Sequence, residues 1–385
     1  MVIERVGIIG GGQLAWMMAG AAEKLGVKLI IQTPNQSDPA VAIATDTILA
    51  PIDDAEATAQ LASRCDVITF ENEFVNLDAL MPLAERGVCF RPSLQVLAPL
   101  LDKYHQRSYM RDLGLPVPKF FALEEKSSAQ AAAPQIEPSD FPLVMKARRH
   151  GYDGQGTAII KSQSELEATW EQWKYVPVML EEFVPFEREL AVIAARSAAG
   201  EIAIYPIVET QQENQVCRRV IVPANLEPKT IVEIEEIART LLESLQAVGI
   251  FGIELFLTAT GQVLINEIAP RTHNSGHFSL DAGETSQFEQ HLRAVCNLPL
   301  GNPNLSCAGA VMVNLLGYER SQNPYLAKRQ QLAEIPHAHV HWYGKTESRP
   351  GRKLGHVTVL QNSPSAQLRQ ESLKLAQICD SIWYG

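Results

Sequence analysis

The chain has 385 residues, of which 46% are apolar and 20% charged, and its formal net charge is −11 at pH 7. That length predicts two or three domains, because single hydrophobic cores seldom grow beyond about 250–300 residues. The acidic balance argues against a nucleic-acid-binding protein, which usually carries a basic surplus. A membrane-spanning helix needs roughly 20 apolar residues in a row, and no run of that length occurs.

The six cysteines are scattered along the chain, and none forms a close pair at metal-ligand spacing. Free thiols in a reducing compartment are therefore expected. The first ten residues lack the basic segment, apolar core and cleavage site of a signal peptide. These features predict a cytoplasmic protein that binds neither membranes nor nucleic acid.

The first hundred residues alternate strands with helices. We expect strands over residues 2–9, 27–31 and 66–70, and a helix from Gln13 to about Leu25. Such alternation is typical of a parallel sheet covered by helices on both faces. The sequence therefore predicts a Rossmann-like domain over residues 1–100.

A glycine motif follows the first expected strand. Gly10-x-Gly12-x-x-Ala15 fits the pattern of a dinucleotide-binding turn, in which backbone N–H groups approach an anion. A nicotinamide site also needs an acidic residue at the end of the second strand, but that strand ends Gln32-Thr33-Pro34. Dinucleotide binding is therefore disfavoured. A structural tight turn and a contact to another anionic ligand both stay open.

The middle of the chain is rich in strands and poor in helices. We expect helices over about 164–173 and 229–247, and strands over 141–149, 157–161, 178–184, 190–195, 202–208, 250–257 and 262–268. This pattern predicts a mainly antiparallel α+β domain over residues 101–300. The turn-rich segment 298–304 is the next expected boundary. A small β-rich domain over 301–385 follows, with strands near 308–315, 338–343 and 354–360 and a helix over 364–380.

Two glutamates face each other across an expected hairpin. With Thr260-Gly261 as a two-residue turn, Glu254 and Glu267 lie directly opposite on one face, with Cβ atoms about 5 Å apart. Facing carboxylates inside apolar strands repel unless a cation lies between them, and Mg²⁺ with nucleotide phosphates suits such a pair. The alternative is a register shifted by one residue, which places the two side chains on opposite faces.

A lysine and a glycine-rich loop suggest phosphate binding. Lys146 interrupts an apolar strand and needs an anionic partner, either a phosphate or an internal carboxylate. The loop Gly151–Gly156 holds three glycines between two strands and can donate backbone N–H groups to phosphates. No P-loop signature occurs in the chain. The run Glu181–Pro185 ends a strand, either as a partner for an adenine edge or as an edge strand closed by proline.

Four cations occur within nine residues of this acidic chain, at Lys345, Arg349, Arg352 and Lys353. They form either a solvated face or a phosphate-binding group. His273 and His277 are spaced H-x-x-x-H, but no third ligand lies nearby, so a zinc site is not expected.

Together these segments resemble the ATP-grasp superfamily and, within it, the family of N5-carboxyaminoimidazole ribonucleotide synthetases. The resemblance covers the whole chain in order, and its run Asn266–His277 is highly specific. It rests on the segments Gly10–Leu14, Thr69–Glu73, Lys146–Gly154, Glu181–Pro185, Asn266–His277, Tyr343–Lys345 and Arg349–His356.

The resemblance implies that ATP lies between two α+β subdomains of a central ATP-grasp domain. The residues implied for ATP are Lys103, Lys146, Gly151, Tyr152, Asp153, Gly154, Gln155, Gly156, Glu181, Glu182, Phe183, Val184, Glu189, Gln212, Asn266 and Glu267. Gln212 stands where the family usually has histidine. Mg²⁺ is implied at Glu254 and Glu267.

The resemblance also implies a reaction. Bicarbonate and ATP would form carboxyphosphate, and the exocyclic amine of aminoimidazole ribonucleotide would be carboxylated, with Asp153, Arg271 and His273 as catalytic residues. The residues implied for the ribonucleotide are Gly12, Gln13, Leu14, Glu73, Tyr152, Arg271, His273, Asn274, Lys345, Arg352 and Lys353.

The family resemblance further suggests a homodimer. Two kinds of rival remain. One is another ATP-grasp ligase, such as formate-dependent glycinamide ribonucleotide transformylase or biotin carboxylase. The other is a nicotinamide-dependent oxidoreductase or a non-catalytic nucleotide sensor.

Overall fold

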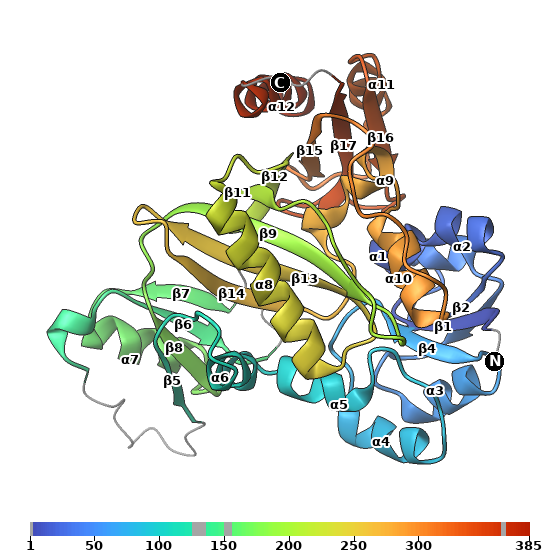
Figure 1. Cartoon of the computed structure of the whole chain (residues 1–385), viewed down its shortest axis with the longest axis horizontal. Coiled ribbons are helices and arrows are strands. Elements are labelled where there is room, and N and C mark those ends of the chain that lie inside the picture. Colours follow the sequence, from blue (N-terminus) through green and yellow to red (C-terminus); the bar gives the residue numbers. More distant parts are fainter. Residues whose placement is uncertain (1–2, 125–135, 150–155, 363–366) are drawn as a thin grey trace.

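The computed structural model describes residues 3–124, 136–149, 156–362 and 367–385. These residues form three sheets, two of four strands and one of nine (Figure 1). Among them, no helix combines the length and apolar content that crossing a bilayer requires. All six cysteines lie in the described ranges, and each is a free thiol.

The N-terminal sheet is parallel, with strand order β3-β2-β1-β4, as the alternating pattern predicts. Its strands are β1 (Arg5–Ile9), β2 (Lys28–Thr33), β3 (Asp46–Leu49) and β4 (Val67–Phe70). The helical segments around it are α1 (Gln13–Trp16), α2 (Ala19–Leu25), η1 (Pro39–Ile43), α3 (Ala55–Ala62), α4 (Leu77–Glu85) and α5 (Leu94–Leu97).

The single helix expected from Gln13 to Leu25 is two helices in the structure. The N–H of Met18 donates to the carbonyl of Ala15 at 3.1 Å, and this i→i−3 bond ends α1 before α2 begins. The short α1 places the glycine motif and the first helical turn next to the end of β4.

A second, antiparallel sheet has the strand order β5-β8-β6-β7. Its strands are β5 (Phe120–Leu123), β6 (Leu143–Ala147), β7 (Thr157–Ile160) and β8 (Val178–Glu182), and α7 (Gln163–Gln172) packs on it. The segment before it, 93–119, carries η2 (Ala98–Leu100) and α6 (Lys103–Asp112), for which no element was expected.

The largest sheet has the order β14-β13-β9-β11-β12-β15-β17-β16, with β10 paired to β9. Its central-domain strands are β9 (Phe186–Arg196), β10 (Ile202–Ile204), β11 (Val208–Glu213), β12 (Val216–Val222), β13 (Gly249–Thr258) and β14 (Val263–Ala269). Helix α8 (Pro228–Leu245) lies across β9 and β13 and supplies apolar side chains to their shared core (Figure 1).

One strand was expected over residues 202–208, but the structure has two. Both β10 and β11 pair with β9, and Tyr205, Pro206 and Ile207 separate them. Proline has no N–H to donate to the ladder, so the pairing is interrupted there.

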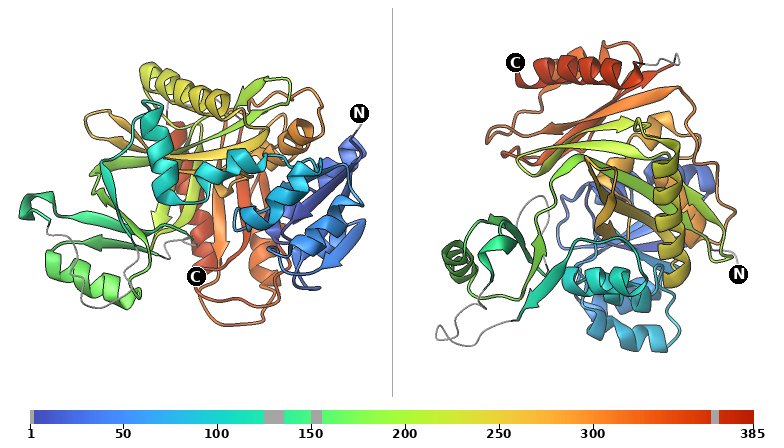
Figure 2. Two further views of the ribbon diagram at one scale, coloured as in Figure 1. Left: turned by 90° about the horizontal axis from the view of Figure 1, so that it is seen from below. Right: turned by 60° about the vertical axis from the view of Figure 1, so that its left-hand side comes forward.

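The C-terminal strands continue the central sheet instead of forming a sheet of their own. Strand β12 pairs with β15, and β15 pairs in turn with β17. The elements of this region are β15 (Gly309–Leu316), α11 (Leu326–Ala333), β16 (Ala338–Trp342), β17 (Lys353–Gln361) and α12 (Leu368–Tyr384). Three short helices connect β14 to β15: η4 (Asn274–Gly276), α9 (Ser279–Ala282) and α10 (Gln287–Val295). The right-hand view of Figure 2 shows α12 at the top and the β5–β8 sheet at the lower left, with the central sheet between them.

The expected hairpin forms, but its turn differs from the prediction. The loop has three residues, Ala259 to Gly261, because the N–H of Thr258 donates to the carbonyl of Gln262 and Gly261 adopts a φ of +81°. A β-bulge then shifts the register between Glu254 and Leu255. The longer loop and the bulge offset each other, so Glu254 and Glu267 are paired as predicted.

Candidate active site

The β13–β14 hairpin presents two carboxylates and an amide to one region. Glu254 and Glu267 are cross-strand partners, and the bulge opposes two β14 residues, Asn266 and Glu267, to one residue of β13. The Asn266 Nδ2 donates to Glu254 Oε2 at 3.3 Å, so the bulged residue faces the same side as the carboxylates. The fold thus builds the predicted pair and adds Asn266 to it.

Basic side chains of the protein contact both carboxylates. Lys103 Nζ lies 2.5 Å from Glu267 Oε2, and His273 Nε2 lies 3.3 Å from Glu254 Oε1. Burial by itself would raise the pKa of Glu254, but His273 and, more weakly, Lys103 and Lys146 lower it to about 2. Both side chains stay partly open, 33% exposed for Glu254 and 36% for Glu267. They are therefore accessible to an incoming ligand.

A third carboxylate, that of Glu189 on β9, adds negative charge to the same face. Burial, and then repulsion by Glu254, raise the pKa of Glu189 to about 7. Burial is the larger cause, and the contribution of Glu254 indicates that the two carboxyl groups lie close together. Grouped carboxylate oxygens fit a divalent cation such as Mg²⁺. Glu254 and Glu267 are thus chemically suited to the predicted metal.

Lys146 on β6 lies beside the hairpin, almost fully buried. Its Nζ donates to Asn266 Oδ1 at 2.9 Å and forms an ion pair with Glu181 of β8. Burial lowers the pKa of Lys146, and the charge of Glu181 opposes this shift. The structure thus shows the internal carboxylate alternative for Lys146, and a phosphate partner stays a prediction.

The segment after β14 carries His273. Gln287 holds its backbone, since Oε1 accepts from the His273 N–H at 2.9 Å and Nε2 donates to the His273 carbonyl at 2.8 Å. A side chain at Gly252 would lie 2.5 Å from His273 Cβ, so the glycine makes room for the histidine. His273 Nδ1 also contacts Ser275 Oγ at 2.8 Å. The imidazole is thereby fixed with Nε2 toward Glu254.

Arg271 connects this segment to the N-terminal domain. Its Nε and Nη2 donate to the two carboxylate oxygens of Glu73, at 2.6 and 3.3 Å. Burial lowers the pKa of Arg271, but the Glu73 carboxylate raises it above its usual value. Glu71 and Glu267 raise it further. The guanidinium therefore lies between Glu71 at the N-terminal glycine loop and Glu267 of the hairpin.

The glycine motif is occupied by the protein itself. Glu71, at the end of β4, accepts from the N–H of Gly12 at 2.7 Å and of Leu14 at 3.1 Å. A Cβ at Gly12 would lie 2.3 Å from Glu71 Oε1. The backbone donors that an anionic ligand would need are thus bound to an internal carboxylate. This supports the structural reading of the turn.

Two of the predicted cations of the C-terminal region contact main-chain carbonyls. Lys345 Nζ donates to the carbonyl of Lys353 at 2.8 Å, and Arg352 Nη1 donates to the carbonyl of Glu347 at 2.8 Å. Asn274 exchanges amide hydrogen bonds with Asn314 of β15. These contacts join the His273 segment to the C-terminal strands.

The remaining predicted residues are placed as follows. The Glu182 carboxylate accepts from the backbone N–H of Lys119. Phe183 is exposed, Val184 is buried, and Gln212 lies at a bulge of β11. Gly156 follows the loop, and its carbonyl accepts from the N–H of Ala147 at 2.7 Å. The predicted residues Gly151, Tyr152, Asp153, Gly154 and Gln155 lie outside the described residues.

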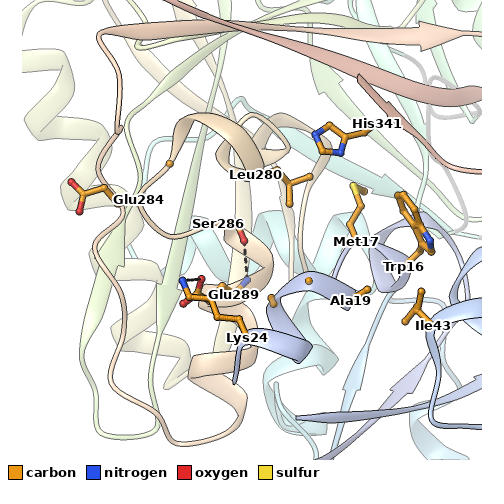
Figure 3. Close-up of a pocket in the computed structure, with 13 residues that line it drawn as sticks. Trp16, Met17, Ala19, Lys24, Ile43, Leu280, Glu284, Ser286, Glu289 and His341 are labelled. Atoms are coloured by element: carbon orange, nitrogen blue, oxygen red, sulfur yellow. Dashed lines mark hydrogen bonds and ion pairs between the residues drawn. The ribbon is translucent and has the colours of Figure 1, made fainter. Parts of the chain in front are cut away.

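A separate pocket of about 500 Å³ lies between α1–α2 and α9–α10 (Figure 3). None of the described residues predicted for ATP, metal or ribonucleotide lines it. At one side, His341 Nε2 contacts Asp281 at 2.9 Å, and the His341 ring stacks on His356 at 4.6 Å. These contacts connect α9 to β16 and β17.

Several residues that shape the site were not predicted. Glu71 was noted only as part of a motif, and Gln287, Gln106 and Arg107 were not singled out. In α6 the signal was present in the sequence, because Gln106 and Arg107 share the buried face with Met110. Polar residues on the buried face of a helix need specific partners.

Three family models match successive parts of the chain. The ribonucleotide synthetase preATP-grasp domain matches residues 3–99, and the ATP-grasp domain matches 108–288. The phosphoribosylaminoimidazole carboxylase C-terminal domain matches 310–371.

The chain is also similar to named relatives over nearly its whole length. It is 53% identical to N5-carboxyaminoimidazole ribonucleotide synthase of Synechococcus elongatus, over 99% of this chain and 96% of the relative. The corresponding protein of Synechocystis sp. is 52% identical, over 99% and 98%.

Two solved structures extend this similarity to three dimensions. N5-carboxyaminoimidazole ribonucleotide synthetase from Thermotoga maritima matches with a TM-score of 0.84 at 38% identity, over 98% of each chain. An Aspergillus clavatus N5-carboxyaminoimidazole synthase in complex with ADP and 5-aminoimidazole ribonucleotide matches with a TM-score of 0.86 at 30% identity, over 99% and 98%.

Proposed function

The chain belongs to the family of N5-carboxyaminoimidazole ribonucleotide synthases, and from this premise we propose how its residues carboxylate 5-aminoimidazole ribonucleotide. The activity is that of an ADP-forming ATP-grasp ligase in purine biosynthesis, with ATP and bicarbonate as co-substrates. The exocyclic amine of the ribonucleotide acquires the carboxylate. The roles below assign the described side chains to the steps of this reaction.

ATP binding is assigned to the region between the β5–β8 sheet and the β13–β14 hairpin. Lys103 and Lys146 carry positive charge beside Glu267 and Asn266, where the phosphates of ATP would replace part of their present ion pairing. Glu254 and Glu267 would hold Mg²⁺, which when bound would neutralise phosphate charge and polarise the transferred group. Glu189 would complete the negative face toward the cation.

The first step transfers the γ-phosphoryl group. An oxygen of bicarbonate attacks the γ-phosphorus, the bond to the β-phosphate oxygen breaks, and carboxyphosphate and ADP form. Lys146 stabilises the negative charge on the transferred phosphoryl oxygens, because it is buried and its ammonium is oriented by Glu181 and Asn266.

The second step forms the carbon–nitrogen bond. Carboxyphosphate releases phosphate and carbon dioxide, the amine nitrogen attacks the carbon, and the nitrogen loses a proton. Arg271 stabilises the anionic intermediate, and His273, oriented by Gln287 and Ser275, positions the amine and receives its proton. Asp153 is assigned to the same amine on the basis of the family resemblance.

The ribonucleotide is assigned to the opening near Glu73, Arg271 and the C-terminal cations. The Glu73–Arg271 ion pair joins the N-terminal domain to the catalytic segment. Burial lowers the pKa of His277, and the charges of His273 and then Lys353 lower it further. Lys353 is thus close enough to act on the same interior. Lys345, Arg352 and Lys353 are suited to the 5-phosphate, and Asn274 and the loop at Gly12–Leu14 to the neighbouring ribose.

The observation that carries this assignment is the opposed pair Glu254–Glu267 flanked by Lys103 and Lys146. The test measures ADP release from ATP, Mg²⁺ and bicarbonate, with and without 5-aminoimidazole ribonucleotide. Strong stimulation by the ribonucleotide, matched by loss of its free amine, is the expected result. ADP release that ignored the ribonucleotide but responded to another amine or to a carboxylate would overturn the substrate assignment.

Domain boundaries at residues 1–100, 101–300 and 301–385 are part of the proposal, with support from the three family models. A homodimer and a cytoplasmic location stay predictions. Light scattering on the purified chain measures the first, and fractionation of cells that express it measures the second.

A further inference from the structure

Helix α6 presents two cations to the ATP site from successive turns. Lys103 contacts Glu267. Arg107, four residues later, lies on the same face of the helix and contacts β8 and β14. Arg107 is only 2% exposed, which is unusual for a guanidinium. A charged group this deeply buried needs several fixed partners.

The guanidinium of Arg107 binds three acceptors at the site. Nη2 donates to Glu181 Oε2 at 2.6 Å and to the Asn266 carbonyl at 2.9 Å, and Nη1 donates to the Ile265 carbonyl. The two carbonyls belong to the bulge that turns Asn266 toward the carboxylates. A bulge locally disrupts the strand ladder, so external donors at these carbonyls fix its geometry.

The neighbouring residue supports the same segment. Gln106 accepts from the N–H of Ile268 at 2.9 Å and donates to the carbonyl of Ile268 at 2.9 Å. Arg107 and Gln106 therefore hold β14 on both sides of Glu267. The position of this carboxylate depends on α6 as well as on its own hairpin.

Arg107 and Lys146 share the carboxylate of Glu181. The buried Glu181 carboxylate binds Arg107 through one oxygen and Lys146 through the other. Were Arg107 absent, Lys146 would be the main counter-charge of Glu181, and its attraction for a phosphate would weaken. With Arg107 present, Glu181 orients Lys146 without consuming its charge.

We propose that Arg107 is a positioning residue for phosphoryl transfer, which fixes the β14 bulge and leaves the charge of Lys146 available to ATP. The proposal rests on the proposed function only in assigning ATP to this region. Arg107 does not touch the nucleotide in this scheme. It acts through Glu181, Lys146, Asn266 and Glu267.

The test compares Arg107→Gln and Arg107→Lys with Arg111→Gln as the matched control. Arg111 lies one turn further along α6, is exposed, and pairs with the adjacent Asp112. We expect Arg107→Gln to lower kcat/KM for ATP by roughly 10–100-fold, the range found for groups that orient metal ligands. The KM for the ribonucleotide should stay unchanged, because Arg107 contacts none of its assigned residues.

Arg107→Lys should recover part of the loss, since it keeps the charge beside Glu181 but cannot reach both carbonyls in the same planar geometry. Arg111→Gln should behave like the unaltered chain. Binding of Mg²⁺ and ATP is measured separately, as the rise in Tm that they cause. This readout does not depend on the identity of the acceptor substrate.

The outcomes separate the two proposals. An unaltered chain that gains thermal stability with Mg²⁺ and ATP but releases no ADP with the ribonucleotide contradicts the proposed function and leaves Arg107 testable by binding. An Arg107→Gln variant with ATP kinetics and ATP-induced Tm shift equal to those of Arg111→Gln overturns the role of Arg107. Equal increases in KM for ATP and for the ribonucleotide also overturn it, because they indicate general loosening.

If Arg107→Gln does not fold, Arg107→Lys decides alone. A raised KM for ATP with an unchanged KM for the ribonucleotide supports the proposal, and unaltered values of both overturn it.

Discussion

The N-terminal glycine loop and the β13–β14 hairpin both place a carboxylate against donors, yet they differ in what a ligand can displace. In the glycine loop, Glu71 is buried and accepts from the backbone N–H groups of Gly12 and Leu14. In the hairpin, Glu254 and Glu267 are about one-third exposed and bind the side chains of His273 and Lys103.

The difference teaches how to judge a binding motif. Backbone N–H groups are fixed in place, so a buried carboxylate that satisfies them becomes part of the fold. The Lys103 ammonium is on a flexible stem and can exchange partners when a phosphate or a divalent cation arrives. The carboxylate at the loop motif therefore serves structure, and the carboxylates of the hairpin serve chemistry. The predictions below test this division.

The largest expected effect is on turnover, at the hairpin. Glu267→Gln should lower ribonucleotide-stimulated ADP release by about 10³-fold, a loss comparable to removing one charge-stabilising group from an active site. The loss occurs because the amide cannot hold Mg²⁺ as a carboxylate does. Steady-state ADP release at saturating ATP, Mg²⁺ and bicarbonate measures it. Glu235→Gln, at an exposed position of α8, is the control, and a Glu267→Gln variant that kept a tenth of the activity would refute the metal assignment.

At the glycine loop, the expected effect is on stability. Glu71→Ala should lower the free energy of unfolding by about 1–3 kcal/mol, because two buried N–H groups lose their acceptor. Denaturant unfolding measures this change, with Glu23→Ala on the exposed side of α2 as the control. The KM for ATP should not change. A raised KM for ATP without lost stability would erase the distinction between the two regions.

The raised pKa of Glu189, on the strand next to the hairpin, predicts a dependence of stability on pH. The pKa of Glu189 is raised to about 7, by burial and then by Glu254, so the folded chain binds a proton there that the unfolded chain releases. Stability from this group should fall as pH rises from about 4.5 to about 7, by at most about 1.4 kcal/mol per pH unit. Unfolding at pH 5 and pH 8 measures it, and Glu189→Gln should abolish this component. Equal pH profiles for the two proteins would contradict the assignment.

The smallest expected effect on stability distinguishes Gly20 from Gly12. Gly20 lies exposed in α2 with open space around its Cβ position, and Gly20→Ala should stabilise the chain by about 0.5–1 kcal/mol. Gly12→Ala should instead destabilise it, because the new Cβ would lie 2.3 Å from Glu71 Oε1. The difference in Tm between the variants measures the contrast. A Gly12→Ala variant as stable as Gly20→Ala would show that Glu71 does not fill the loop.

Most strands and the facing glutamates could be predicted from local patterns. Apolar runs bounded by turn formers located β1, β2, β4, β6, β7, β13 and β14. The pairing of Glu254 with Glu267 was predicted correctly with an incorrect turn, because a bulge near Asn266 compensated for the longer loop. A bulge leaves no distinct mark in hydrophobic alternation, so its position could not be anticipated.

Other features depend on contacts between distant segments. Helix α6 was not predicted, and Arg107 joins it to residues 74 and 159 positions away, Glu181 and Asn266. Nothing in the local sequence of any of the three specifies the others. Likewise, the sequence predicted the C-terminal strands as a separate unit, because no local signal shows that β15 pairs with β12.

The sequence by itself determined the chemistry available to this protein: opposed carboxylates, buried lysines, a glycine loop and a specific run around His273. Residue type and short-range spacing specify these features, and both can be read along the chain. Only the tertiary structure decided which groups are free to react. Glu71 occupies the glycine loop from 59 positions away, and Arg107 supports the hairpin from another helix. Such pairings are set by packing of the complete fold, since burial makes each polar group depend on whichever partner lies nearest in space.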